Sequence, residues 1–368
     1  MGLVVAKNKW TLLFESNFPG VEGCFFLLIC LVIAIGYRTK GFCAEESKTV
    51  PDGFIFQAAE NTDVIYKNFL NKGIRFTGSA KYTDSEKKIR AGVAKDNIFN
   101  TPFFAGFDLS RRWEGDDRYN LRGQGRDIYA GMNITEQTKL TLKFENEDIK
   151  MYRLSDNAPQ LLKNSAGVKK AGDLALNFER STLDDRYYPT KGAHQSLEWD
   201  FAKKGLASDC NFNRLTLQFR GYTTPGRFFT YAFRTKAGWV EEFDSSSQVP
   251  YFERFFAGGT GTIRGYKGKH VGPKDDQDLP LGGDLLWVNN FEVRFPIYKK
   301  LSGAYFIDAG SLWERPGKFS LEDLKCGTGF GLRYATKWGV ARLDYGIRLT
   351  HEKDESRSVA HLSFGIPF

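Results

Sequence analysis

Alternation of apolar and polar side chains runs through most of the chain after residue 73. A clear example is residues 229–239, which begin Phe-Thr-Tyr-Ala-Phe-Arg. Successive side chains of a β-strand point to opposite faces, so this period of two predicts strands with one apolar and one polar face. About fourteen such segments fall between residues 73 and 368, an even number within the range of single-chain barrels. No helical crossover pattern separates them, so the predicted sheet is antiparallel.

A soluble β-sandwich would also alternate, but two features favour a barrel in a membrane. Aromatic residues recur near the ends of the apolar faces, as they do at membrane interfaces. The polar faces carry many long charged side chains: Arg214, Arg220, Arg234, Lys236, Arg294, Arg333, Arg342 and Arg348. The mean hydropathy of −0.41 fits, because half of each strand faces water. We therefore predict an all-β fold, a transmembrane antiparallel β-barrel over residues 73–368.

The N-terminal part differs in pattern. Residues 24–36 are apolar throughout, but the run is shorter than the ~20 residues that a spanning helix needs. It fits the apolar region of a signal peptide, and Gly41-Phe42-Cys43 before Ala44 suits a cleavage site. We predict a signal peptide over residues 1–44, with an uncleaved anchor as the alternative. Residues 45–72 are expected to be a short periplasmic lead-in with a short helix at 63–70.

Several function classes are not expected. The net charge is +8, but the basic residues are dispersed along strands instead of clustered, so nucleic-acid binding is not predicted. The five cysteines include no CxxC pair and no Cys/His cluster, so no metal site is predicted. The four histidines are scattered, and neither a nucleophile elbow nor a phosphate-binding loop is present. We expect neither an enzyme nor a cofactor.

A glycine-rich stretch, Phe255–Tyr266, lies between two alternating segments and runs on to Gly272-Pro273 and Gly282-Gly283. Long loops inside a compact fold are usually functional. Arg264, in its centre, offers five donors and a permanent charge, which suits the binding of carboxylates. On the loop alone, an ordinary solvated surface arginine remains an equal alternative.

Five motifs together resemble the outer-membrane assembly barrels of the BamA, TamA, Sam and Toc type, the bacterial surface antigen family. They are Arg264-Gly265-Tyr266, Phe291–Pro296, Phe306–Gly310, the turn containing Asp184, Pro189, Thr190 and Gly192, and the C-terminal Phe364, Ile366 and Phe368. The resemblance covers residues 73–368. The family barrel has sixteen strands, so the missing pair is expected around residues 112–126.

The resemblance implies that the loop folds back into the lumen, where Arg264 would meet Glu292 and Asp308. Strand parity puts both carboxylates on the polar face. We call this expected arrangement the loop lock; in the alternative, the carboxylates only line a wet lumen. The first strand (73–82) and the last (358–368) would form a seam that admits client strands.

The implied function is insertion or export of outer-membrane proteins in the bacterial outer membrane. An organellar outer membrane is the alternative location. The implied partners are the outer-membrane lipid bilayer, unfolded outer-membrane protein clients and a periplasmic partner protein. A second reading is a passive pore or structural barrel that has lost client handling.

Overall fold

The computed structural model describes residues 54–56, 58–69, 73–82, 86–116, 118–243, 248–336, 339–350 and 356–365. The expected signal peptide, Ile366 and Phe368 lie outside these ranges. The strands are β1 Phe54–Phe56, β2 Ala58–Phe69, β3 Ile74–Tyr82, β4 Glu86–Lys95, β5 Phe103–Asp116, β6 Tyr119–Asn133, β7 Thr138–Tyr152, β8 Lys170–Ser181, β9 Gly192–Ala202, β10 Phe212–Thr223, β11 Thr230–Glu241, β12 Leu285–Tyr298, β13 Leu301–Trp313, β14 Lys325–Thr336, β15 Gly339–Arg348 and β16 Ser358–Gly365. The helices are α2 Gln160–Ser165 and four short 3-10 turns, Ile98–Asn100, Tyr251–Glu253, Pro316–Lys318 and Leu321–Asp323.

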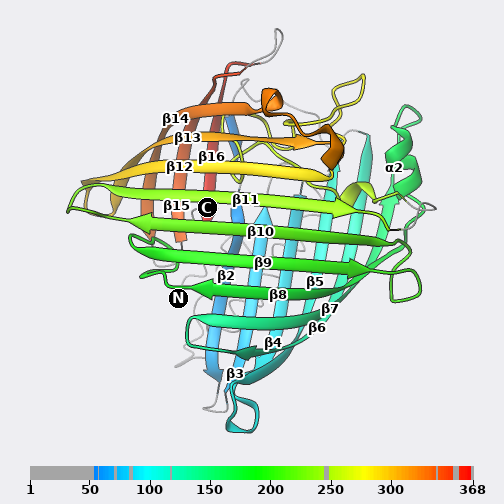
Figure 1. Cartoon of the computed structure of the whole chain (residues 1–368), viewed down its shortest axis with the longest axis horizontal. Coiled ribbons are helices and arrows are strands. Elements are labelled where there is room, and N and C mark those ends of the chain that lie inside the picture. The colour runs from blue at the N-terminus through cyan, green and yellow to red at the C-terminus, as the bar shows by residue number, and fades with distance from the viewer. Residues whose placement is uncertain are drawn as a thin grey trace, which may run out of the picture. The chain divides into compact units, whose positions relative to one another are not determined.

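The strands form one curved sheet in which chain neighbours lie side by side from β2 to β16 (Figure 1). Each of these neighbouring pairs is antiparallel, for example β12 with β13. The predicted antiparallel, all-β class is confirmed, and β3–β16 supply the expected fourteen strands. Among the described residues, no helix is long and apolar enough to cross a membrane.

Two expectations near the start of the sheet are wrong. The short helix expected at 63–70 is part of β2, which pairs with β3, so the sheet begins before residue 73. Polar residues interrupt the alternation in β2, which hides the strand from a pattern of period two. The missing pair expected at 112–126 does not exist either, because β5 and β6 pair from Phe103 to Asp116. Both faces are polar there, and Arg111 on the outer face is exposed.

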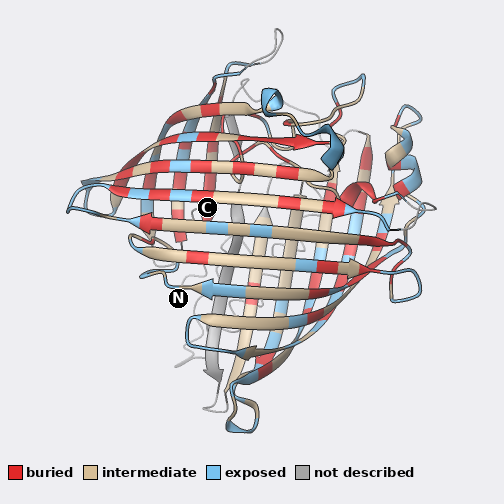
Figure 2. Ribbon diagram, in the orientation of Figure 1, coloured by how far each residue is buried: buried red, intermediate tan, exposed pale blue. Residues whose placement is uncertain are grey.

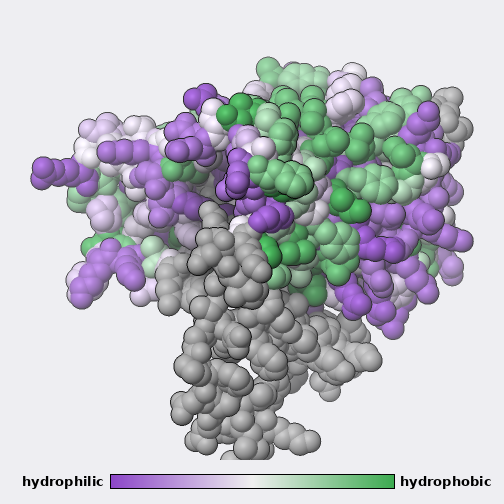
Figure 3. Space-filling view, turned by 90° about the horizontal axis from the view of Figure 1, so that it is seen from below, coloured by the Kyte–Doolittle hydropathy of each residue, from purple (hydrophilic) through white to green (hydrophobic). Residues whose placement is uncertain are grey.

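The two faces of the sheet have opposite chemistry. Large apolar side chains on the outer face are exposed, among them Ile128 at 61% and Phe330 at 63%. Exposed and buried residues alternate along the strands (Figure 2). Figure 3 shows apolar residues gathered over a continuous stretch of the surface, with polar residues on either side of it. An apolar outer band of this kind faces lipid in membrane barrels.

The loop between β11 and β12 packs against the inner face of the sheet. Ile263, Tyr266 and Val271 are buried together with Val288 of β12 and Leu312 of β13. A second apolar cluster joins an earlier part of the loop to α2 and to the ends of β6 and β7, through Tyr251, Phe252, Leu162, Leu121 and Ile149. The loop is therefore anchored at the rim of the barrel and also inside the lumen, where the resemblance implies that it folds.

The two ends of the sheet meet at β16. β1 pairs with β16 in parallel at Phe54↔Ala360, Ile55↔His361 and Phe56↔Leu362, and β2 lies beside β16. The expected seam strand, 73–82, is β3, which instead lies between β2 and β4. The reason is that β2 precedes the fourteen strands β3–β16 in the antiparallel series, so β2 and β16 run in the same direction. β1 comes directly before β2 in the chain and pairs with β16 in parallel.

Candidate functional site: an arginine of the loop buried against the barrel wall

Arg264 lies at the centre of a buried charge cluster. Its Nε and Nη2 donate to the two carboxylate oxygens of Asp308 at 2.7 and 2.8 Å, and its backbone N–H donates to Asp308 at 2.9 Å. Its Nη1 donates to Glu292. The guanidinium also lies 3.6 Å from the ring centroid of Phe306. Arg264 is 1% exposed and both carboxylates are 0% exposed. The contacts expected for the loop lock are therefore present.

Glu292 of β12 is shared by three arginines. Besides Arg264, it accepts hydrogen bonds from Arg294 at 2.8 Å and from Arg333 of β14 at 2.9 Å. Arg333 is also 2.6 Å from Asp344 of β15. Three carboxylates thus compensate these three arginines away from solvent, as buried charges require. Arg342 of β15, the register partner of Arg333, is buried beside them. Strand parity indicated that these groups face inward, but their pairing depends on the register of four strands.

Asn290 joins the loop backbone to the same cluster. Its side-chain amide donates to Asp308 at 2.7 Å and to the carbonyl of Thr262 at 2.6 Å. Arg234 of β11 donates to Asn290 at 2.9 Å and to the carbonyl of Gly261 at 2.5 Å. Sequence reasoning did not identify Asn290; its position two residues before Glu292, on the same face of the strand, was the available signal.

Gly265 and Tyr266 fix the loop against the last strands. Gly265 has a φ of +93°, a conformation that glycine adopts without strain. Its N–H donates to His361 at 3.4 Å, and its carbonyl accepts from Arg348 at 2.8 Å. The Tyr266 hydroxyl hydrogen-bonds with Thr350 Oγ1 at 2.8 Å. The loop therefore contacts β12 to β16.

Glycines in the strands leave the space that the loop backbone occupies. A Cβ at Gly327 of β14 would lie 2.0 Å from the carbonyl oxygen of Arg264. A Cβ at Gly346 of β15 would lie 2.4 Å from the backbone nitrogen of Gly265. These glycines were missed in the sequence, although glycine at inward positions of a strand is a signal of close backbone approach.

The turn motif forms a compact loop between β8 and β9. Asp184 Oδ1 accepts from the backbone N–H groups of Thr190 at 2.9 Å and Lys191 at 3.1 Å, and its Oδ2 accepts from the Thr190 hydroxyl at 2.5 Å. Pro189 precedes Thr190. Gly192 has a φ of +94°, and a Cβ there would meet the carbonyl oxygen of Thr182 at 2.2 Å.

The same turn reaches the charge cluster through Tyr188. The Arg294 guanidinium lies 5.8 Å from the centroid of the Tyr188 ring, and the Tyr188 hydroxyl is 2.6 Å from Ser302 Oγ of β13. Burial alone would raise the pKa of Asp184. The hydrogen bonds from Thr190, Lys191 and Asp185 outweigh it and hold this pKa below its usual value. Of the C-terminal motif, Phe364 lies in β16, opposite Ala341 of β15.

Comparison with known proteins adds independent information. A family model described as the Omp85 superfamily domain matches residues 68–368. The outer membrane protein assembly factor BamA of Nitratidesulfovibrio vulgaris is 23% identical over 315 residues, which are 84% of this chain and 40% of that protein. A SAM50-like protein of Schizosaccharomyces pombe is 26% identical over 67% of this chain and 53% of its own length. The chain thus spans about half of these relatives or less.

Solved structures show the same fold. BamA from Haemophilus ducreyi lacking POTRA domains 1–3 superposes with a TM-score of 0.65 at 17% identity, over 82% of this chain and 65% of that one. CdiB from Acinetobacter baumannii superposes with a TM-score of 0.54 at 14% identity, over 81% and 54%.

Proposed function

The chain belongs to the Omp85 superfamily, and from that premise we propose that it assists the insertion or export of outer-membrane proteins. Its relatives include outer membrane protein assembly factors. The proposed setting is the bacterial outer membrane, with the lipid bilayer and unfolded outer-membrane proteins as partners. A periplasmic protein that delivers clients is a further proposed partner.

The observation that carries the proposal is the buried pairing of Arg264 with Glu292 and Asp308. A barrel that only conducts solutes does not require a loop arginine that is buried against carboxylates of the barrel wall. A loop fixed in this way makes β12–β15 stiffer than the junction between β16 and β1, where the described residues form three backbone pairs. We propose that client strands pair at that junction, because an edge with few backbone pairs is a template for another strand.

The test is reconstitution in liposomes. The folding rate of a small, unfolded outer-membrane barrel is followed with the wild-type protein, with Arg264→Ala and with empty liposomes. Acceleration by the wild-type protein that falls by at least tenfold in Arg264→Ala is expected. Lys267→Ala is the matched control, since Lys267 is an exposed cation of the same loop, and it should accelerate folding like the wild type.

A passive pore is the second candidate, and one observation favours it. A cavity of about 580 Å³ remains in the lumen beside β3–β9, so the loop does not fill the barrel. Steady conductance in a planar bilayer together with no acceleration of client folding would select the pore and reject the assembly function.

A further inference from the structure

The cavity beside β3–β9 is lined by more cations than anions. Seven basic side chains and four carboxylates face it, and none of the described residues of the loop between β11 and β12 takes part. The basic side chains come from β3, β4 and β7 and from the turn after β8. A volume of about 580 Å³ is within the range of small-ligand pockets.

Three of the basic residues in this region stand in one row across neighbouring strands. Lys81 of β3 is the register partner of Lys88 of β4, and Lys88 is the partner of Arg112 of β5. Like charges directly opposite each other destabilise a sheet. Carboxylates of the protein or a bound anion must therefore offset the row.

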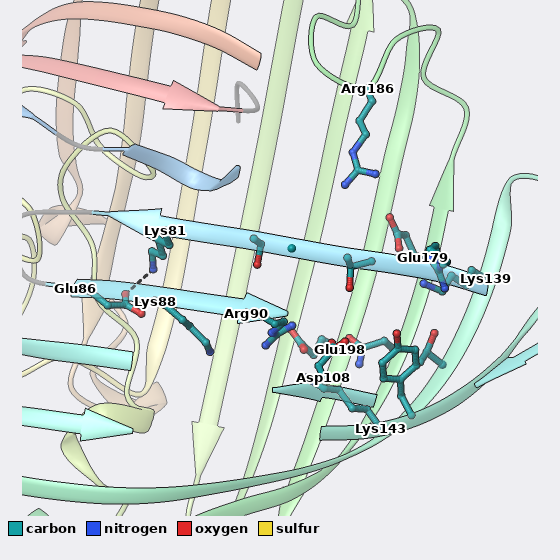
Figure 4. Close-up of a pocket in the computed structure, with 17 residues that line it drawn as sticks. Lys81, Glu86, Lys88, Arg90, Asp108, Lys139, Lys143, Glu179, Arg186 and Glu198 are labelled. Atoms are coloured by element: carbon teal, nitrogen blue, oxygen red, sulfur yellow. Dashed lines mark hydrogen bonds and ion pairs between the residues drawn. The ribbon is translucent and has the colours of Figure 1, made fainter. Parts of the chain in front are cut away.

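The outer two cations of the row have carboxylate partners and the middle one does not. Lys81 is 2.6 Å from Glu86, and Arg112 is 2.9 Å from Glu147. Within the described part of the chain, Lys88 makes no hydrogen bond or ion pair, although its side chain is half-buried. Figure 4 shows Lys88 pointing into the cavity beside the paired Lys81 and Glu86.

The nearby carboxylates are already shared. Arg90, two residues after Lys88 on the same face, is 3.7 Å from Asp127, and Lys143 is 3.1 Å from the same group. Of the other lining carboxylates, Glu179 lies farther along the cavity beside Lys139, whereas Glu198 and Asp108 lie between Arg90 and Lys143 (Figure 4). Glu145 and Glu147, the carboxylates that act electrostatically on Lys88, are engaged by Lys143 and Arg112. Among the described residues, Lys88 is therefore the cation of the row that has no carboxylate partner of its own.

We propose that this end of the lumen binds a water-soluble oxyanion of the phosphate type, held by Lys88 with Lys81 and Arg90. A partly desolvated ammonium without a partner is costly, and a multivalent anion removes that cost. A phosphate-type group can accept hydrogen bonds from several cations at once. The polar inner face excludes lipid, which makes a soluble anion the fitting ligand. The inference is independent of client assembly.

Inorganic pyrophosphate is the probe. The thermal midpoint of the purified full-length protein in detergent is measured over a pyrophosphate titration, with ionic strength held constant by NaCl because screening alone relieves repulsion. Binding to the folded state should raise the midpoint by a few degrees at saturation. Lys88→Gln should abolish this rise, and without pyrophosphate its midpoint should equal or exceed that of the wild type.

Two further variants complete the test. Arg111→Gln removes a cation from the outer face of β5 and should keep the full pyrophosphate shift. Lys88→Arg keeps the charge and should retain most of it. Isothermal titration should give about one pyrophosphate per wild-type chain and none for Lys88→Gln. Equal shifts in wild type and Lys88→Gln, or no shift in either, would overturn the proposal.

Discussion

At the scale of the residue, the cluster around Arg264 is asymmetric. Asp308 receives two side-chain hydrogen bonds from Arg264 and one from Asn290. Glu292 instead compensates three separate guanidinium groups. Removing a carboxylate leaves the cations around it buried without compensation, and that penalty is what a substitution measures. Glu292 is therefore the residue whose neutralisation affects the most charges.

Glu292→Gln should lower the free energy of unfolding by about 3–5 kcal/mol, the usual cost of breaking a buried ion pair. The side chain keeps its size, so lost packing contributes little. Urea titration of the folded protein in lipid vesicles provides the measurement. Glu198→Gln is the control, because Glu198 is only half-buried and lines the cavity, and it should change stability by less than about 0.5 kcal/mol. Equal effects of the two substitutions would contradict the role given to Glu292.

At the scale of the element, the turn between β8 and β9 depends on one carboxylate. The Asp184 side chain holds the backbone of Thr190 and Lys191 and so closes the turn on itself. The same turn places the Tyr188 ring beside the Arg294 guanidinium. A local hydrogen-bonding group thus connects a surface turn to the buried charge cluster.

The pKa of Asp184 gives the turn a pH dependence of known sign. This pKa is lowered in the folded protein, so the carboxylate stabilises the turn above the ordinary aspartate pKa of about 3.9. The stabilisation is lost as the pH falls through the lower, folded value. Hydrogen exchange at the Thr190 and Lys191 amides, corrected for intrinsic rates, should rise below about pH 4. In Asp184→Asn it should be fast already at pH 6; protection unchanged in that variant would refute the assignment.

Whether a strand can be predicted from the sequence depends on what its two faces contact. Most of β3–β16 has one face toward lipid and one toward water or charge, so the alternation survives there, and these segments and their faces are predictable from the sequence. In β2 and in residues 111–126 polar residues occupy both faces, which removed the signal. The pairing of Arg264 with Glu292 and Asp308 was expected from a family resemblance. The contributions of Asn290 and Arg333 depend on strand register, which one sequence does not reveal.

At the scale of the whole molecule, the loop braces strands β12 to β16, whereas the ladder between β16 and β1 is short. The loop contacts β12 to β16 through buried polar groups, whereas the ladder between β16 and β1 consists, among the described residues, of the pairs at residues 54–56 and 360–362. Every other neighbouring pair of strands is joined by a longer ladder, such as the one between β15 and β16. If strands of the sheet separate, the junction of β16 with β1 and β2 is where separation costs least.

Locking that junction is a direct test of whether clients use it. In a cysteine-free background, a disulfide between Phe56→Cys and Leu362→Cys would join register partners of β1 and β16. Ala341→Cys with Phe364→Cys, register partners of β15 and β16, is the control. If clients enter at the junction, oxidation of the first pair should abolish accelerated client folding in liposomes, and reduction should restore it. The control pair should have no effect, because it joins strands that stay paired. Full acceleration by the locked junction would mean that clients do not pass between β1 and β16, even if Arg264 proves essential.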